Sequence, residues 1–212
     1  MAGCCGHDAK FDGVSQDYKR RLWLVIAINA VMFFVEITAG HMAKSQALQA
    51  DALDFLGDAL TYGISLAVIG ASLRLRAKAA MAKGISLLAM GIWVFGSTLY
   101  RVFYIGVPAA EIMGLIGFLA LTANLASVLI LVRYKDGDAN VRSVWLCSRN
   151  DAIGNVAVMF AAFGVWGTAS GWPDLIVAGI MASLFLSSAF QIITQAIQEH
   201  REMSSHKHEA TS

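Results

Sequence analysis

Six apolar runs, each about as long as a bilayer is thick, divide this sequence almost from end to end. The chain has 212 residues, of which 57% are hydrophobic and only 15% are charged. A helix needs roughly 20 apolar residues to cross the hydrocarbon core of a membrane. We place such runs at 22–42, 47–70, 82–105, 109–132, 144–167 and 174–197. The sequence therefore predicts an all-α integral membrane protein with six transmembrane helices.

These runs divide the chain into three parts. Residues 1–21 form a polar tail without the features of a signal peptide, residues 22–197 form the six-helix transmembrane domain, and residues 198–212 form a second short tail. Six spans leave too little chain outside the membrane for a soluble globular domain. The net charge of +1 gives no indication of a nucleic-acid partner.

The basic residues predict which side of the membrane each end faces. Three segments carry almost all of them: the N-terminal tail, the link between runs two and three, and the link between runs four and five. Cytoplasmic loops are enriched in Lys and Arg. We therefore expect both termini to be cytoplasmic. The residues are Lys10, Lys19, Arg20, Arg21, Arg74, Arg76, Lys78, Lys83, Arg133, Lys135 and Arg142.

The second run carries three acids, Asp51, Asp54 and Asp58, among apolar and small residues. A carboxylate at bilayer depth costs at least a few kcal/mol, so such residues usually face a partner or a pathway. Asp54 and Asp58 are four residues apart and share one helix face. Arg149 is the one basic residue that we place where it can pair with them. One arginine against three carboxylates leaves an excess of negative charge, which favours a bound cation over a structural ion pair.

The fifth run supplies further candidate ligands on one helix face, with Asp151 at the centre, Cys147 four residues before it and Asn155 four residues after it. At about 1.5 Å per residue, Asp58 and Asp151 both lie about 12 Å from the cytoplasmic end of their runs. On the same scale Asp54 and Asn155 lie at about 18 Å and Cys147 at about 6 Å. Two antiparallel helices can thus bring three carboxylates together, with either Cys147 or Asn155 as the fourth ligand.

Further polar residues lie in the first run and in the N-terminal tail. Asn29 and Glu36 in the first run are seven residues apart, and we interpret them as interhelical hydrogen-bonding groups. Cys4, Cys5 and His7 combine thiols and an imidazole, which suit capture of a transition metal at the cytoplasmic side, although a tail without a role has the same composition. Patterns typical of ATP hydrolysis, zinc proteases or serine hydrolases do not occur in the sequence.

These features resemble the cation diffusion facilitator family of divalent metal transporters. The strongest local match is the segment 50–60, in which Asp54 is followed four residues later by Asp58. The match in the fifth run is poorer, because Cys147 stands where the family typically has a histidine. The resemblance implies a transport site of Asp54, Asp58, Cys147 and Asp151, with Asp51 and Asn155 as supporting or alternative ligands. It also implies exchange of the metal for protons.

The resemblance also implies the cargo and the setting of the protein. A thiolate ligand favours zinc or cadmium, with cobalt as a further substrate, whereas a site without Cys147 is oxygen-rich and suits iron(II), cobalt or manganese. We expect no permanently bound cofactor, and lipid, metal ions, protons and a second copy of the chain as partners in the cytoplasmic membrane. Only about 15 residues follow the last run, so we expect a short member without the family's C-terminal cytoplasmic domain.

Two alternatives belong to other classes of protein. A membrane-embedded metalloenzyme can use the same carboxylates to activate water, but such sites usually include histidine, and we place none of the five histidines in the membrane core. A passive cation channel can use rings of acids in an oligomer. A secondary transporter, not an enzyme, is the prediction from the sequence.

Overall fold

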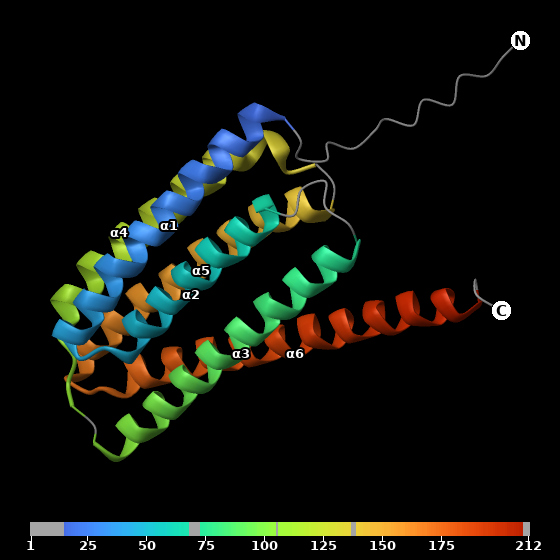
Figure 1. Ribbon diagram of the computed structural model, residues 1–212. Helices are drawn as coiled ribbons and strands as arrows, with labels where there is room; N and C mark the ends of the chain where they lie inside the picture. Colours follow the sequence, from blue (N-terminus) through green and yellow to red (C-terminus); the bar gives the residue numbers. More distant parts are fainter. Residues whose placement is uncertain (1–14, 68–72, 105, 137–138, 210–212) are drawn as a thin grey trace, which may run out of the picture.

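The computed structural model describes residues 15–67, 73–104, 106–136 and 139–209, and the regular structure in these ranges is helical (Figure 1). Each predicted run lies within or largely within one long helix, which confirms the all-α class. The helices are α1 Gln16–Ala43, α2 Gln46–Ala67, α3 Leu73–Phe103, α4 Ala110–Leu131, α5 Ala139–Thr168 and α6 Trp172–Glu209, with a short 3-10 turn, η1, at Val132–Tyr134.

Five of the helical segments are long and apolar enough to cross a membrane. They are Gln16–Ala43, Met81–Phe103, Ala110–Tyr134, Ser148–Thr168 and Trp172–Thr194. Helix α2 has 22 residues and therefore sufficient length, but its three aspartates set it apart from the other five. The acids that mark the candidate site thus also distinguish α2 from the five segments that qualify as membrane spans.

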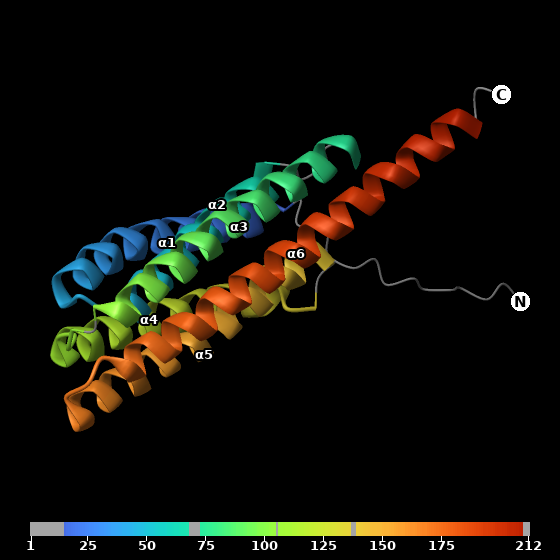
Figure 2. The same ribbon diagram turned by 90° about the horizontal axis from the view of Figure 1, so that it is seen from below.

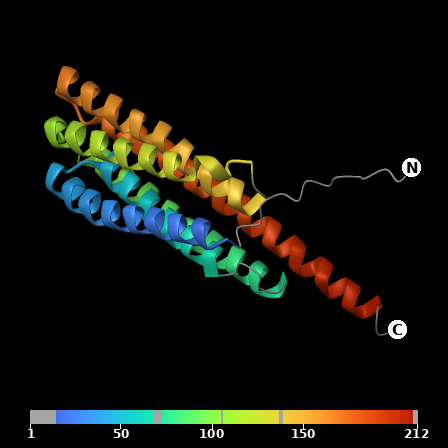
Figure 3. The ribbon, with the colours of Figure 1, turned by 90° about the horizontal axis from the view of Figure 1, so that it is seen from above.

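The helices form two groups that run side by side (Figures 1 and 2). Helices α1, α2, α4 and α5 form one group, held mainly by the α1–α2, α4–α5 and α1–α4 pairs. Helices α3 and α6 form an extensive pair, which contacts the first group through α2 and α5. Figure 3 shows the end of α6 extending beyond the other helices. This division leaves α2 facing both α3 and α6, and α5 facing α6.

The connections α1–α2, α3–α4 and α5–α6 lie at one end of the bundle (Figure 1). Lys44 ends α1 in the left-handed conformation at φ 55°, and the N–H of Ser45 bonds back to the carbonyl of Gly40 at 3.0 Å. The N–H of Ala109, just before α4, bonds to the carbonyl of Ala43 at 2.9 Å. These backbone bonds fix the α1–α2 turn against the loop that leads into α4.

The protein surface is largely apolar, and buried polar groups lie inside the bundle. Large hydrophobic side chains such as Phe34, Phe103 and Trp166 are exposed, whereas Asn29 and Glu36 are buried. A soluble protein rarely exposes large contiguous apolar areas. This distribution suits a protein surrounded by lipid, because lipid tails are as apolar as the side chains that they contact.

Glycine lets α3 approach α6 closely. A Cβ added at Gly84 lies 2.6 Å from Cγ1 of Ile193, and one added at Gly91 lies 2.9 Å from Cδ2 and 3.2 Å from the backbone N of Leu186. Both separations are below ordinary van der Waals contact. The α3–α6 pair therefore depends on the missing side chains, as small residues in membrane helices generally permit close packing.

Candidate metal site

A polar stripe follows one face of α2 through the centre of the protein. Asp51 and Asp58 are seven residues apart, so they share a face, and they are 1% and 9% exposed. Tyr62 and Ser65 continue the stripe towards the end of the helix and are also buried. Apolar clusters flank it: one contains Leu48 of α2, and another contains Tyr62 itself. The fold thus buries Asp51 and Asp58 of α2, and half-buries Asp54, rather than exposing these acids to lipid.

A cavity of about 370 Å³ lies between α2, α5 and the α3–α6 pair. Asp54, Asp58 and Asp151 all line it, so the fold brings the three predicted carboxylates to one space from two helices. Apolar residues of α3 and α6 form much of the remaining wall. They are Leu87, Met181, Leu184, Phe185 and Ile192.

Asp151 interacts with the side chains of both Asp54 and Asp58. This agrees with the common depth expected from the helix rise. Among the residues that the structure describes, however, no three His, Cys, Asp or Glu side chains are close enough together to hold a metal ion as they stand. The assignment of Asp54, Asp58 and Asp151 as ligands is therefore still a prediction.

The other predicted ligands either lie outside the described part of the structure or do not line the cavity. Cys147 belongs to α5, but its side chain lies outside the described part of the structure, and so do Cys4, Cys5 and His7. Asn155 is fully buried, and neither of its amide atoms has a hydrogen-bond partner among the described residues. Asn155 does not belong to the lining of the cavity.

Three polar side chains that the sequence analysis did not select also line this cavity: Asn150, Thr61 and Ser188. Asn150 lies on α5 directly before Asp151, and its Oδ1 accepts a hydrogen bond of 3.3 Å from Arg149. Thr61 lies three residues after Asp58 on α2. Proximity in sequence to the two acids is the signal that points to Asn150 and Thr61, whereas Ser188 of α6 has no such signal.

Tyr62 is a further residue that sequence reasoning missed. Its hydroxyl group donates a hydrogen bond to Oδ2 of Asp58, four residues earlier on α2. The hydroxyl oxygen of Tyr62 also lies 3.3 Å from Oγ of Ser148 and 3.4 Å from the carbonyl oxygen of Val144, both on α5. One tyrosine thus connects a candidate metal ligand to the neighbouring helix.

Lys83 corrects the expectation that Arg149 alone can pair with the acids. The ammonium group of Lys83 donates a hydrogen bond of 2.8 Å to Oγ of Ser65 and attracts the carboxylate of Asp58. Arg149 is exposed, and its guanidinium group lies 5.6 Å from the ring centre of Trp145. The expectation failed because Lys83 was assigned to a cytoplasmic link, whereas the packing of α3 on α2 brings its charge near enough to attract Asp58.

Asp51 lies in the interface between α1 and α2, where its acidic neighbour is Glu36 rather than Asp151. It interacts with Glu36 of α1, which is 0% exposed. Neither oxygen of Glu36 has a hydrogen-bond partner among the described residues, and the same is true of Oδ2 of Asp51. Asp51, like Asn155, is absent from the lining of the cavity. The acids of α2 thus belong to two settings: Asp54 and Asp58 at the cavity, and Asp51 beside Glu36.

The fold and the cavity together define a class of protein: a helical membrane protein in which buried and half-buried carboxylates from two helices line one cavity. Comparison with known proteins gives the family. A model of the cation efflux transmembrane domain matches residues 22–199, so the chain belongs to the cation efflux family. This finding confirms the resemblance that the α2 segment indicated.

Relatives in the family carry the names of metal transporters. The chain is 29% identical to "Zinc transporter ZitB" of Yersinia pestis over 87% of its length, and 24% identical to "Metal cation efflux system protein CzcD" of Cupriavidus metallidurans over 91%. It is 27% identical to "Zinc transporter ZitB" of Pectobacterium atrosepticum over 85%. The chain spans 60–64% of the length of these three relatives.

Proposed function

We propose that this protein moves a divalent transition-metal cation, zinc in the first place, out of the cytoplasm in exchange for protons. The observation that carries the proposal is the cavity with Asp54, Asp58 and Asp151 on its wall. Three acids on two helices attract a dication strongly where little water screens their charge. Membership of the cation efflux family and the names of the relatives support the same cargo class.

In this proposal α2 is the sixth membrane span, and both termini are cytoplasmic. Its aspartates face the cavity or the α1 interface instead of lipid, which removes the main objection to placing the helix in a membrane. The three connections at one end of the bundle then face away from the cytoplasm. We further propose a homodimer in the cytoplasmic membrane, by the same family resemblance.

The chemistry of exchange follows from competition for the same oxygens. A carboxylate that binds a metal ion must release its proton, and a proton that arrives from the other side displaces the metal. A central site that opens alternately to each side then couples the two flows without ATP. In the metal-bound state the three carboxyl groups would close around the ion, with Cys147 or Asn155 as a fourth ligand.

The test uses purified protein in proteoliposomes with a pH-sensitive dye inside. Metal added on one side of the membrane should move protons the other way, and the size of the signal across zinc, cadmium, cobalt, iron(II) and manganese ranks the substrates. Asp54→Asn, Asp58→Asn and Asp151→Asn should each abolish exchange. Asp136→Asn is the matched control, because Asp136 is exposed and lies outside the helices.

The other classes of function give different results in the same experiment. A passive channel carries metal down its gradient without moving protons and never accumulates metal against a gradient. A metalloenzyme forms a product without net metal flux; the names of the relatives give it no support. Normal exchange in all three aspartate variants would show that the proposed site is wrong.

A further inference from the structure

The hydroxyl group of Tyr62 joins a metal-site carboxylate to the opposite helix. Its bond to Oδ2 of Asp58 stays within α2, whereas its contacts with Ser148 and Val144 cross to α5. A phenol has one proton to donate and further lone pairs to accept with. Since the tyrosine proton is used in the hydrogen bond to Asp58, the Ser148 hydroxyl group is the donor in its contact with the tyrosine oxygen. A chain of hydrogen bonds then runs from Ser148 through Tyr62 to Asp58.

The ring of Tyr62 is fixed by its surroundings. The side chain is 0% exposed and packs in one cluster with Leu22 and Val25 of α1, Leu131 of α4 and Val144 of α5. Close-packed interiors hold side chains in single rotamers. The hydroxyl group therefore has a fixed position, and the carboxyl group of Asp58 must orient itself to meet it.

We propose that Tyr62 is a positioning residue of the metal site: it holds Oδ2 of Asp58 and so favours Oδ1 as the oxygen that binds a metal ion. This inference rests on the proposed function and adds a determinant of affinity and selectivity to it. A carboxylate limited to one free oxygen suits a tetrahedral ion such as zinc, which takes few ligands. Ions that prefer octahedral oxygen coordination, such as manganese, lose more when the second oxygen is occupied.

The competing explanation is that Asp58 only satisfies a buried hydroxyl group. In that case Tyr62 contributes to stability, and its removal changes the melting temperature but not the relative affinities for metals. The two explanations differ in metal binding measured at equilibrium on folded protein, which provides the test.

The experiment measures zinc and manganese binding to the purified full chain by competition with a chromogenic chelator. Tyr62→Phe keeps the ring and removes the hydroxyl group. We expect zinc to bind roughly 10 to 100 times more weakly, which is the usual effect of removing a group that orients a metal ligand, and the preference for zinc over manganese to fall. Tyr134→Phe is the matched control, because its hydroxyl group bonds to Asp17 at 2.5 Å, away from the cavity.

A double-mutant cycle separates action through Asp58 from a general structural effect. In an Asp58→Asn background, Tyr62→Phe should weaken zinc binding no further. Wild-type affinity in Tyr62→Phe, or an equal loss in both backgrounds, would overturn the positioning role. If Asp54→Asn binds zinc as tightly as the wild type does, the metal site of the proposed function is wrong, whatever the role of Tyr62. The two failures are therefore distinguishable.

Discussion

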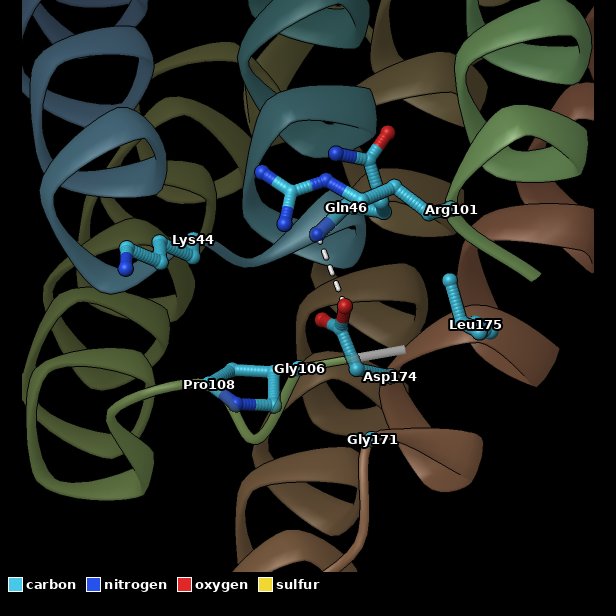
Figure 4. A pocket seen from close by; sticks show the side chains of 8 residues that line it. All are labelled: Lys44, Gln46, Arg101, Gly106, Pro108, Gly171, Asp174 and Leu175. Carbon is cyan, nitrogen blue, oxygen red and sulfur yellow. Dashed lines mark hydrogen bonds between the residues drawn. The ribbon is translucent and has the colours of Figure 1, made fainter. Parts of the chain in front are cut away.

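The carboxylate of Asp174, in the first turn of α6, accepts a hydrogen bond of 2.6 Å from the hydroxyl group of Ser45 in the α1–α2 turn. The same carboxylate accepts the backbone N–H groups of Gln46 at 2.7 Å and Ala47 at 3.0 Å, as Figure 4 shows for Gln46. The first N–H groups of a helix lack partners within the helix. An acid of α6 therefore caps α2, which carries the candidate site, and ties the two helices together at the end where the turns meet.

Replacing Asp174 by Ala should destabilise the fold strongly. The change leaves a buried hydroxyl group and two backbone N–H groups without their acceptor, and each such group costs about 1–3 kcal/mol. We expect a loss of about 3 kcal/mol in the free energy of unfolding, seen as a lower melting temperature of the purified protein in detergent. Glu111→Ala is the control, since Glu111 is an exposed acid in the first turn of α4. An unchanged melting temperature would show that water replaces the cap without cost.

The α3–α6 interface predicts opposite effects for two glycines of the same helix. Gly91→Ala places a methyl group 2.9 Å from the side chain of Leu186 and 3.2 Å from its backbone N, and such overpacking typically costs about 1–3 kcal/mol. Gly96→Ala places one in open space, where alanine is the better helix former by about 1 kcal/mol. Melting temperatures should therefore fall for Gly91→Ala and hold or rise for Gly96→Ala. Equal effects of the two changes would contradict this packing.

Glu36 and Asp51 predict an unusual response to losing an acid. Two buried carboxyl groups lie next to each other, and three of their four oxygens lack a hydrogen-bond partner among the described residues. Glu36→Gln removes one of the two adjacent carboxyl groups and gives Asp51 an N–H donor at almost the same volume. We expect the melting temperature to hold or to rise, whereas Leu48→Gln, a change at a buried apolar site of similar volume on α2, should lower it. A lower melting temperature in Glu36→Gln would mean that the carboxyl group of Glu36 itself is needed.

The sequence was sufficient for the class of fold and for the grouping of three acids. Apolar runs of bilayer length predicted the helices, and the helix rise alone placed Asp54, Asp58 and Asp151 at similar depth. Both inferences depend on distances along one helix, which the sequence determines directly. The cavity that these three residues share agrees with them.

Contacts between helices could not be predicted in the same way. The sequence gives no sign that Ser188 of α6 reaches the cavity, or that Asn155 does not line it. Such placements depend on the rotation and tilt of each helix, and a rotation of a few tens of degrees moves a residue from one interface to another. Tyr62 is intermediate: its spacing from Asp58 was visible, but its contacts with α5 were not.

Lys83 allows a prediction about charge at the site. Its ammonium group attracts Asp58 from α3, so it competes with a metal ion for the same carboxylate. Lys83→Gln removes the charge and should strengthen zinc binding several-fold in the chelator competition, while Lys83→Arg, which keeps the charge, should stay near wild type. The difference should shrink at high salt, because ions screen charges that water can reach.

A second variant separates the charge of Lys83 from its hydrogen bond. Ser65→Ala removes the acceptor of the 2.8 Å bond and leaves the ammonium group in place. If charge competition governs binding, Ser65→Ala should leave zinc affinity unchanged, because the charge of Lys83 stays in place. If zinc binds more weakly in Lys83→Gln and in Ser65→Ala alike, the lysine acts by holding α3 against α2, and the competition argument is wrong.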